Sequence, residues 1–69
     1  MKRYAFVIEK AGENYSAYVP DLPGCIARGP TVAATEELLR EAVALHMQGM
    51  KEDGIPVPPP SSVVDYVVV

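Results

Sequence analysis

The stretch 19-VPDLPGCIARG-29 lies near the middle of a chain of 69 residues, and it decides how the first half of that chain folds. Proline restricts the backbone torsion φ and glycine reaches torsions that other residues avoid, so the two prolines and Gly24 predict a sharp corner. The segments on either side, residues 15–20 and 25–28, read as extended. We therefore interpret the stretch as a corner between two strands.

A first strand is predicted before this pair. Residues 2–10, KRYAFVIEK, are rich in aromatic and β-branched side chains, which are frequent in strands. Tyr4, Phe6 and Ile8 would share one face of that strand, because side chains alternate between the two faces. Residues 11–14, AGEN, predict a hairpin loop of about four residues, so the next strand would run back antiparallel.

A helix of about five turns is predicted after the corner. Thr31 is a candidate N-cap, and Gly54 and Pro56 indicate the end of the helix. Between these ends, apolar residues recur at steps of three and four: Leu38, Leu39, Ala42, Val43, Leu45, Met47 and Met50. The proline-rich residues 55–62 then predict an extended connector.

The last segment, 63-VVDYVVV-69, has a high strand propensity. The predicted order is β-β-β-α-β, an α+β fold in a single domain of residues 1–69, with an antiparallel-containing sheet and one helix on one face. We expect no C-terminal DNA-binding domain. One helix covers only one face, and a free apolar strand is prone to aggregate, so we expect a homodimer or homotetramer. The expected interface is Val63, Val64, Tyr66, Val67, Val68 and Val69.

Composition narrows the classes of partner. The single cysteine excludes an internal disulfide and cannot by itself form a zinc site. The net charge is −3, with nine acidic and six basic residues, so we expect a basic protein partner rather than direct binding of nucleic acid. No segment approaches the roughly 20 apolar residues of a membrane span. We expect a cytoplasmic protein with no membrane partner.

Two sets of residues were candidates for catalysis. A catalytic Cys25 would need a base, and the sole histidine, His46, is about twenty residues downstream in the helix. A metal-dependent nuclease would need converging carboxylates, and nothing in the pattern brings the acidic residues of the strands and the corner together. Those residues are Glu9, Glu13, Asp21 and Asp65. We expect no catalytic residue, no metal and no cofactor.

Three blocks of the sequence together resemble the HicB antitoxin family. The first is YSAYVPDLPGC, from Tyr15 to Cys25, and the third is 52-EDGIPVPPPSS-62. The second is a spaced pattern made of Gly29, Thr31, Thr35, Leu39, Glu41 and Ala42. The resemblance covers nearly the whole chain, with the blocks in the same order.

The resemblance implies a partial ribonuclease-H-like fold without its catalytic carboxylates. It also implies a HicA-like toxin as partner, a small basic protein that cleaves messenger RNA and that the antitoxin occludes. The residues we expect to contact it are Asp21, Leu22, Pro23, Glu36, Glu37 and Glu41, although a solvated acidic helix face has the same pattern. Two alternatives are an oligomeric regulatory or structural protein without a toxin, and a remnant metal-dependent nuclease.

Overall fold

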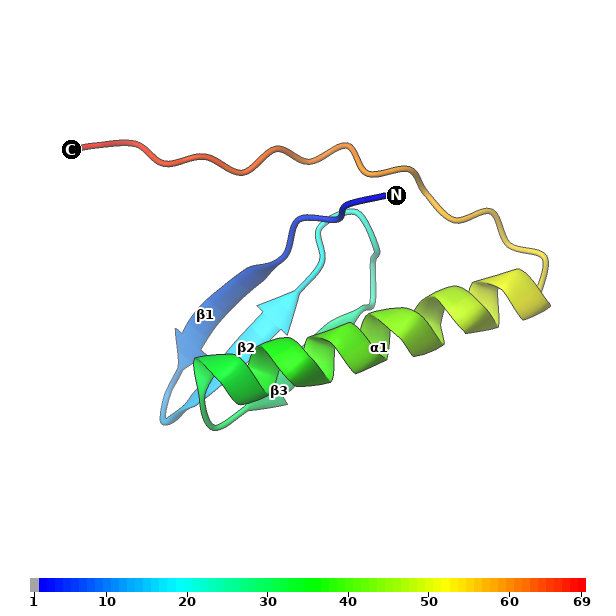
Figure 1. Ribbon diagram of the computed structural model, residues 1–69. Coiled ribbons are helices and arrows are strands. Elements are labelled where there is room, and N and C mark those ends of the chain that lie inside the picture. Colours follow the sequence, from blue (N-terminus) through cyan, green and yellow to red (C-terminus); the bar gives the residue numbers. More distant parts are fainter. Residues whose placement is uncertain (1) are drawn as a thin grey trace.

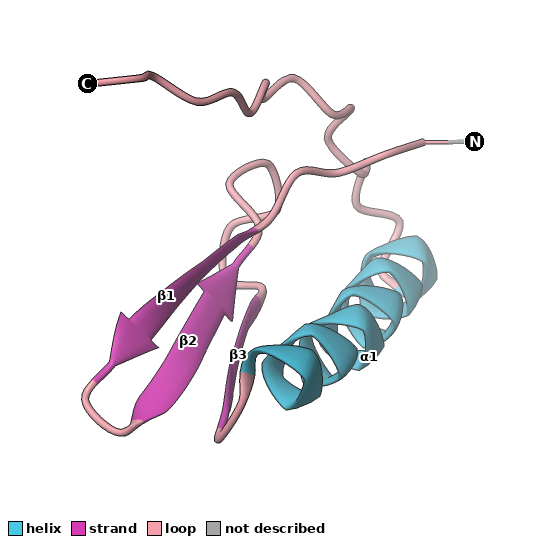
Figure 2. Cartoon of the chain, turned by 60° about the vertical axis from the view of Figure 1, so that its left-hand side comes forward, coloured by secondary structure: helices cyan, strands magenta, loops and turns pink. Residues whose placement is uncertain are grey.

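A three-stranded antiparallel sheet, one long helix and an extended tail make up the protein (Figure 1). The computed structural model describes residues 2–69. The elements are β1 (Val7–Ala11), β2 (Asn14–Tyr18), β3 (Ile26–Gly29) and α1 (Val32–Glu52), and the strands lie in the order β1-β2-β3. The helix forms a second layer on one face of the sheet, mainly against β2 and β3 (Figure 2). The predicted α+β class is confirmed.

The corner between β2 and β3 consists of two successive tight turns. The Leu22 amide donates to the Val19 carbonyl at 3.1 Å, and the Cys25 amide donates to the Leu22 carbonyl at 3.1 Å. Each turn has a proline at its second position, and Gly24 follows Pro23 with φ of +85°, which is the requirement of a type II turn. The predicted corner is confirmed, and it folds from its own backbone.

The first strand is shorter than predicted. The pairing of β1 with β2 runs from Val7 opposite Tyr18 to Ala11 opposite Asn14, so residues 2–6 are not part of the strand. The turn that closes this hairpin contains two residues rather than four, with Gly12 at φ of +64°. Since β2 ends before the corner, residues 2–6 extend past the end of their only neighbouring strand.

Local signals set both ends of α1. The Thr31 hydroxyl oxygen accepts a hydrogen bond from the Ala34 amide at 3.0 Å, which confirms the predicted N-cap. At the other end Gly54, with φ of +67°, donates to the Lys51 carbonyl and Ile55 donates to the Met50 carbonyl. This pair of bonds is the Schellman arrangement that ends many helices at glycine. No helix in residues 2–69 is long and apolar enough to cross a membrane.

The core lies between the sheet, the corner and the inner face of α1. Its buried apolar members are Ala17, Val19, Leu22, Cys25 and Leu39. Gly29 lets β3 approach the helix closely, because a Cβ at this position would lie 2.8 Å from Oγ1 and 3.1 Å from the backbone nitrogen of the buried Thr35. The corner therefore does two things: it reverses the chain, and it supplies three of the five buried apolar side chains.

The last predicted strand is not formed within the chain. Residues 55–69 are extended but pair with no strand of residues 2–69, and they form the tail that crosses the molecule and projects past the strands (Figures 1 and 2). In the described structure the order is β-β-β-α followed by this tail. High strand propensity produces a strand only where a neighbouring backbone offers hydrogen bonds, and the tail lies beside none.

Candidate partner-binding site

The residues predicted to contact a partner fall in two places. Asp21, Leu22 and Pro23 lie in the corner, whereas Glu36, Glu37 and Glu41 lie in the first half of α1. The corner precedes β3 and the helix follows it, so the two groups lie toward opposite ends of β3 (Figure 1). The structure brings the three glutamates together and separates them from the corner.

The side of α1 turned away from the sheet carries both acidic and apolar groups. Glu37, Leu38, Glu41 and Leu45 lie within about 100° of one another at 3.6 residues per turn. We call these four residues the outer helix face. Leu38 is 43% exposed and Leu45 is 70% exposed, whereas Leu39 on the inner side is 2% exposed.

The positions of Leu38 and Leu45 differ from the sequence-based expectation. The three- and four-residue steps place both in the apolar stripe of the helix, yet a sheet of three short strands is too narrow to cover a stripe that wide. Leu39 and the residues on its side of the helix occupy the surface that the sheet and the corner offer. Ala42, Val43 and Met47 are partly buried there against the core. Leu38 and Leu45 are left in solvent, where exposed leucines beside acidic groups suit a protein contact.

The charges on this part of the helix are only partly compensated. Glu36 pairs with Arg40 at 2.9 Å, in an exposed contact that contributes little to stability. Glu37 and Glu41 are exposed and make no salt bridge within residues 2–69. Their carboxylates are one helical turn apart, so they present two negative charges on one side, beside the two leucines. That combination suits a basic surface with apolar side chains.

Asp21 has an internal role that the sequence did not indicate. One carboxylate oxygen accepts from the Ser61 and Ser62 amides, each at 2.9 Å. The other oxygen accepts from the Ser61 and Ser62 hydroxyls at 3.1 Å and 2.7 Å. These bonds, led by those from the Ser62 and Ser61 amides, lower the pKa of Asp21 from 3.8 to about 2. A carboxylate has about four acceptor sites, so all of them hold the tail, and a partner binding there would compete with it.

The neighbours of Asp21 differ in what they can offer a partner. Leu22 is fully buried in the core, so its side chain stabilises the corner and is closed to a partner in this conformation. Pro23 is exposed on the outside of the turn. Of the corner residues predicted to bind a partner, only Pro23 presents an exposed side chain that the tail does not engage.

The structure gives the candidates for catalysis no activating surroundings within residues 2–69. Cys25 is buried, and burial raises the pKa of its thiol, which disfavours the reactive thiolate. His46 lies on α1 and is partly exposed. Within residues 2–69, no three histidine, cysteine or acidic side chains converge into a group that could hold a metal ion.

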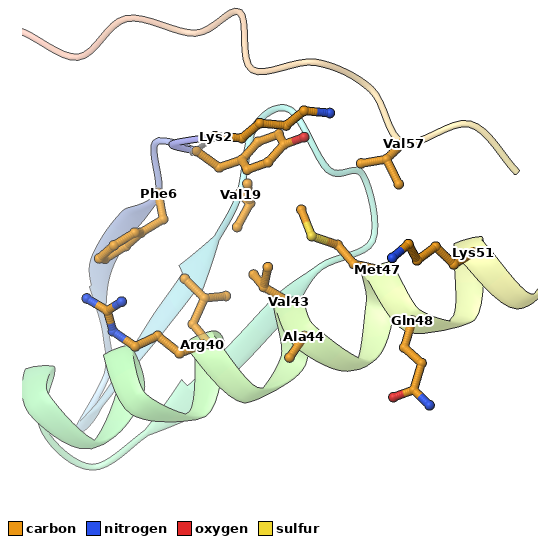
Figure 3. A pocket seen from close by; sticks show the side chains of 12 residues that line it. Lys2, Phe6, Val19, Arg40, Val43, Ala44, Met47, Gln48, Lys51 and Val57 are labelled. Carbon is orange, nitrogen blue, oxygen red and sulfur yellow. The ribbon is translucent and has the colours of Figure 1, made fainter.

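A groove between residues 2–6 and α1 is a feature that the sequence did not reveal (Figure 3). Its volume is about 800 Å³, and Tyr4, Phe6, Val19, Val43 and Met47 are among its apolar lining residues. The sequence contained both walls of this groove. Tyr4 and Phe6 lie on one side of an extended segment, and Val43 and Met47 lie one turn apart on the helix. Their juxtaposition depends on how α1 crosses the sheet, which no local pattern specifies.

Known proteins resemble this chain in sequence and in fold. The sequence profile described as "HicB_like antitoxin of bacterial toxin-antitoxin system" matches residues 4–68. An uncharacterised 14.9 kDa protein encoded in the rep-hol intergenic region of Haemophilus phage HP1 is 34% identical over 64 residues, which are 93% of this chain and 48% of that protein. A chain of the solved "HicA3 and HicB3 toxin-antitoxin complex" superposes with a TM-score of 0.69 at 36% identity. The match covers 83% of this chain and 66% of that one, so this chain spans about half to two thirds of these relatives.

Proposed function

The chain belongs to the HicB-like antitoxin family, and we propose that it binds and occludes a small basic HicA-like toxin. The observation that carries the proposal is the likeness, at 36% identity, to a chain of a solved toxin–antitoxin complex. The proposed role is that of a binding protein rather than an enzyme, and its proposed location is the cytoplasm, where its partner's messenger RNA substrate lies.

We place the toxin contact on the outer helix face. Leu45, at the C-terminal end of this face, would be an apolar anchor, because burying its exposed side chain removes apolar surface from water. Glu37 and Glu41 would face basic side chains of the toxin, speeding association and selecting the partner by charge. A toxin whose RNA-binding surface is basic would then lose access to RNA when that surface is covered.

The test uses the full chain and, as the candidate toxin, a purified small basic HicA-like protein from the same source. Binding is measured by calorimetry at low and high salt, and toxin activity is measured as cleavage of a messenger RNA. The wild-type chain should bind and stop cleavage. Glu37→Lys and Glu41→Lys should each weaken binding by at least about tenfold at low salt and by less at high salt.

Glu52→Lys is the matched control for these reversals. It makes the same charge change on the same helix, roughly 22 Å further along the axis from position 37. It should therefore bind the toxin nearly as the wild type does. Absence of any complex, or continued cleavage in the presence of saturating wild-type chain, would refute the proposed function. If all three charge reversals weakened toxin binding equally, the toxin would still be the partner, but the outer helix face would not be its binding site.

A further inference from the structure

The groove between residues 2–6 and α1 is built to receive an extended segment. On one side lies the backbone of residues 2–6, which is extended beyond the end of β2 and pairs with no strand in the described chain. On the other side lie Val43 and Met47 of α1. A strand entering here gains backbone partners along one edge and an apolar floor beneath alternate side chains, as in strand addition to a sheet edge.

The tail has the chemistry that fits such a groove. In an extended segment alternate side chains point the same way, so Val64, Tyr66 and Val68 form one wholly apolar side. Their exposed fractions are 58%, 90% and 97%, so Tyr66 and Val68 bury almost nothing within their own chain and Val64 buries less than half of its surface. Seven residues at about 3.3 Å each span roughly 23 Å, long enough to run beside residues 2–6.

Charge complementarity supports the same pairing. Lys2, Arg40 and Lys51 line the groove, and in the described part of the chain neither lysine makes a salt bridge. Residues 63–69 carry one charged side chain, the carboxylate of Asp65. An apolar segment with one negative charge therefore matches an apolar groove that has basic side chains along it. A basic toxin would meet like charges there.

Residues 63–69 of the same chain are held away from this groove, although Val57, earlier in the tail, lines it. The Tyr4 hydroxyl donates to the Pro58 carbonyl, and Asp21 binds Ser61 and Ser62. Val57 lines the groove at the point where the tail passes, and the tail then continues beyond the strands (Figures 1 and 3). To return, residues 63–69 would have to reverse direction. They contain no glycine, proline or asparagine, and six of the seven are Val or Tyr, which disfavour tight turns.

We propose that residues 63–69 of a second copy of this chain occupy the groove and pair with residues 2–6, and that the two copies exchange tails reciprocally. Exchange of an identical element about a two-fold axis satisfies both tails and both grooves at once. The apolar sides of both tails are then buried, so neither copy exposes a free apolar strand. The apolar floor of the groove, Val43 and Met47, lies about 160° around α1 from Leu45 at 3.6 residues per turn. The proposal does not rest on the toxin.

The first test measures the mass of the full chain by light scattering over a wide range of concentrations. The wild type should have twice the monomer mass of 7.4 kDa. Tyr66→Asp places a charge in the groove and should weaken dimerisation by at least about 100-fold, with an unchanged circular dichroism spectrum because Tyr66 packs on nothing in its own chain. Leu45→Asp is the matched control, an exposed apolar residue on the opposite side of α1, and should remain dimeric.

The second test identifies the occupant of the groove. In a Cys25→Ala background, Val68→Cys and Met47→Cys are made in separate chains and then mixed under oxidising conditions. The tail of one copy in the groove of the other should give a disulfide-linked pair that contains one chain of each kind. A monomeric wild type at every concentration, a dimer that survives Tyr66→Asp, or a mixture of the two cysteine chains that forms no disulfide between them would each overturn the proposal.

Discussion

Residues 7–52 and residues 63–69 are both rich in apolar side chains, but only the first region buries them within the same chain. The difference lies in what each region can pack against. The corner, the strands and the inner side of α1 present complementary faces to one another. The tail follows the helix in the chain. Because the single helix covers its face of the sheet, residues 63–69 have no surface of the described chain to pack against. Apolar composition thus predicts that a segment will be buried, but not by which chain.

The same contrast appears in how the two regions are attached. Residues 7–52 are held by interlocking core contacts and by backbone ladders. The tail is attached mainly by the Tyr4–Pro58 bond and by the Asp21 carboxylate, which are few and polar. Loss of a core contact should therefore unfold the protein, whereas loss of the tail's attachment should leave the folded unit intact. The following three experiments test this difference, and each is best done in Tyr66→Asp chains so that association does not contribute to stability.

The largest effect is expected from Leu39→Ala. Leu39 is 2% exposed in the centre of the core, and truncation of a buried leucine costs about 2–5 kcal/mol. In a domain this small, that is a large share of the total stability. Urea unfolding followed by circular dichroism measures the loss. Leu45→Ala, the same change on the outer helix face, should cost less than about 0.5 kcal/mol. Equal losses would contradict the assignment of inner and outer sides.

Replacing Gly29 or Gly49 by alanine should change the stability by a smaller amount, and in opposite directions. Gly29→Ala places a Cβ against Thr35, including its backbone, and should cost about 1–3 kcal/mol. Gly49→Ala meets no atom within 4 Å and replaces glycine inside a helix, so it should stabilise by about 0.5–1 kcal/mol. Thermal unfolding should show a fall of several degrees for the first and a rise for the second. A higher melting temperature for Gly29→Ala would rule out close packing of β3 on α1.

The smallest effect concerns the attachment of the tail. The pKa of Asp21 is lowered from 3.8 to about 2 by the serine bonds, so the ionised carboxylate favours the attached tail. Because the folded pKa lies below the ordinary value, this contribution is fully present above about pH 4 and is lost as the pH falls toward 2. A carbon-13 NMR titration of the Asp21 carboxyl should show a midpoint near 2.

The serines provide the control for this titration. In a chain with Ser61→Ala and Ser62→Ala, the hydroxyl bonds are lost and the amide bonds remain possible, so the midpoint should rise only part of the way toward 3.8. In Asp21→Asn chains, the Ser61 and Ser62 amides should lose their protection from exchange while the amides of β2 keep theirs. A midpoint near 3.8 in the wild type would mean that Asp21 does not hold the tail.

Local sequence was sufficient for the features whose hydrogen bonds close within a few residues. The corner follows from two prolines and Gly24, the start of α1 from Thr31, and its end from Gly54. Part of the candidate site is of this kind too, because the spacing of Glu37 and Glu41 places them on one side of any helix. Their exposure was therefore foreseeable, although their partner was not.

Features that depend on distant partners were not predictable in this way. Leu22 was expected to contact a partner, but the turn folds its side chain into the core. Leu38 and Leu45 fit the apolar period of the helix, yet the width of the sheet leaves them exposed. Asp21 gave no sign of serine partners forty residues later in the chain.

The sequence by itself determined the order of the three strands and the helix, the corner and the ends of the helix, because torsional preferences and capping bonds act over a few neighbouring residues. Only the tertiary structure decided where β1 begins, which leucines of α1 are buried, where the groove opens and what becomes of the tail. These outcomes depend on how much area a short sheet offers to one helix. That area exists only once segments distant in the sequence have packed together.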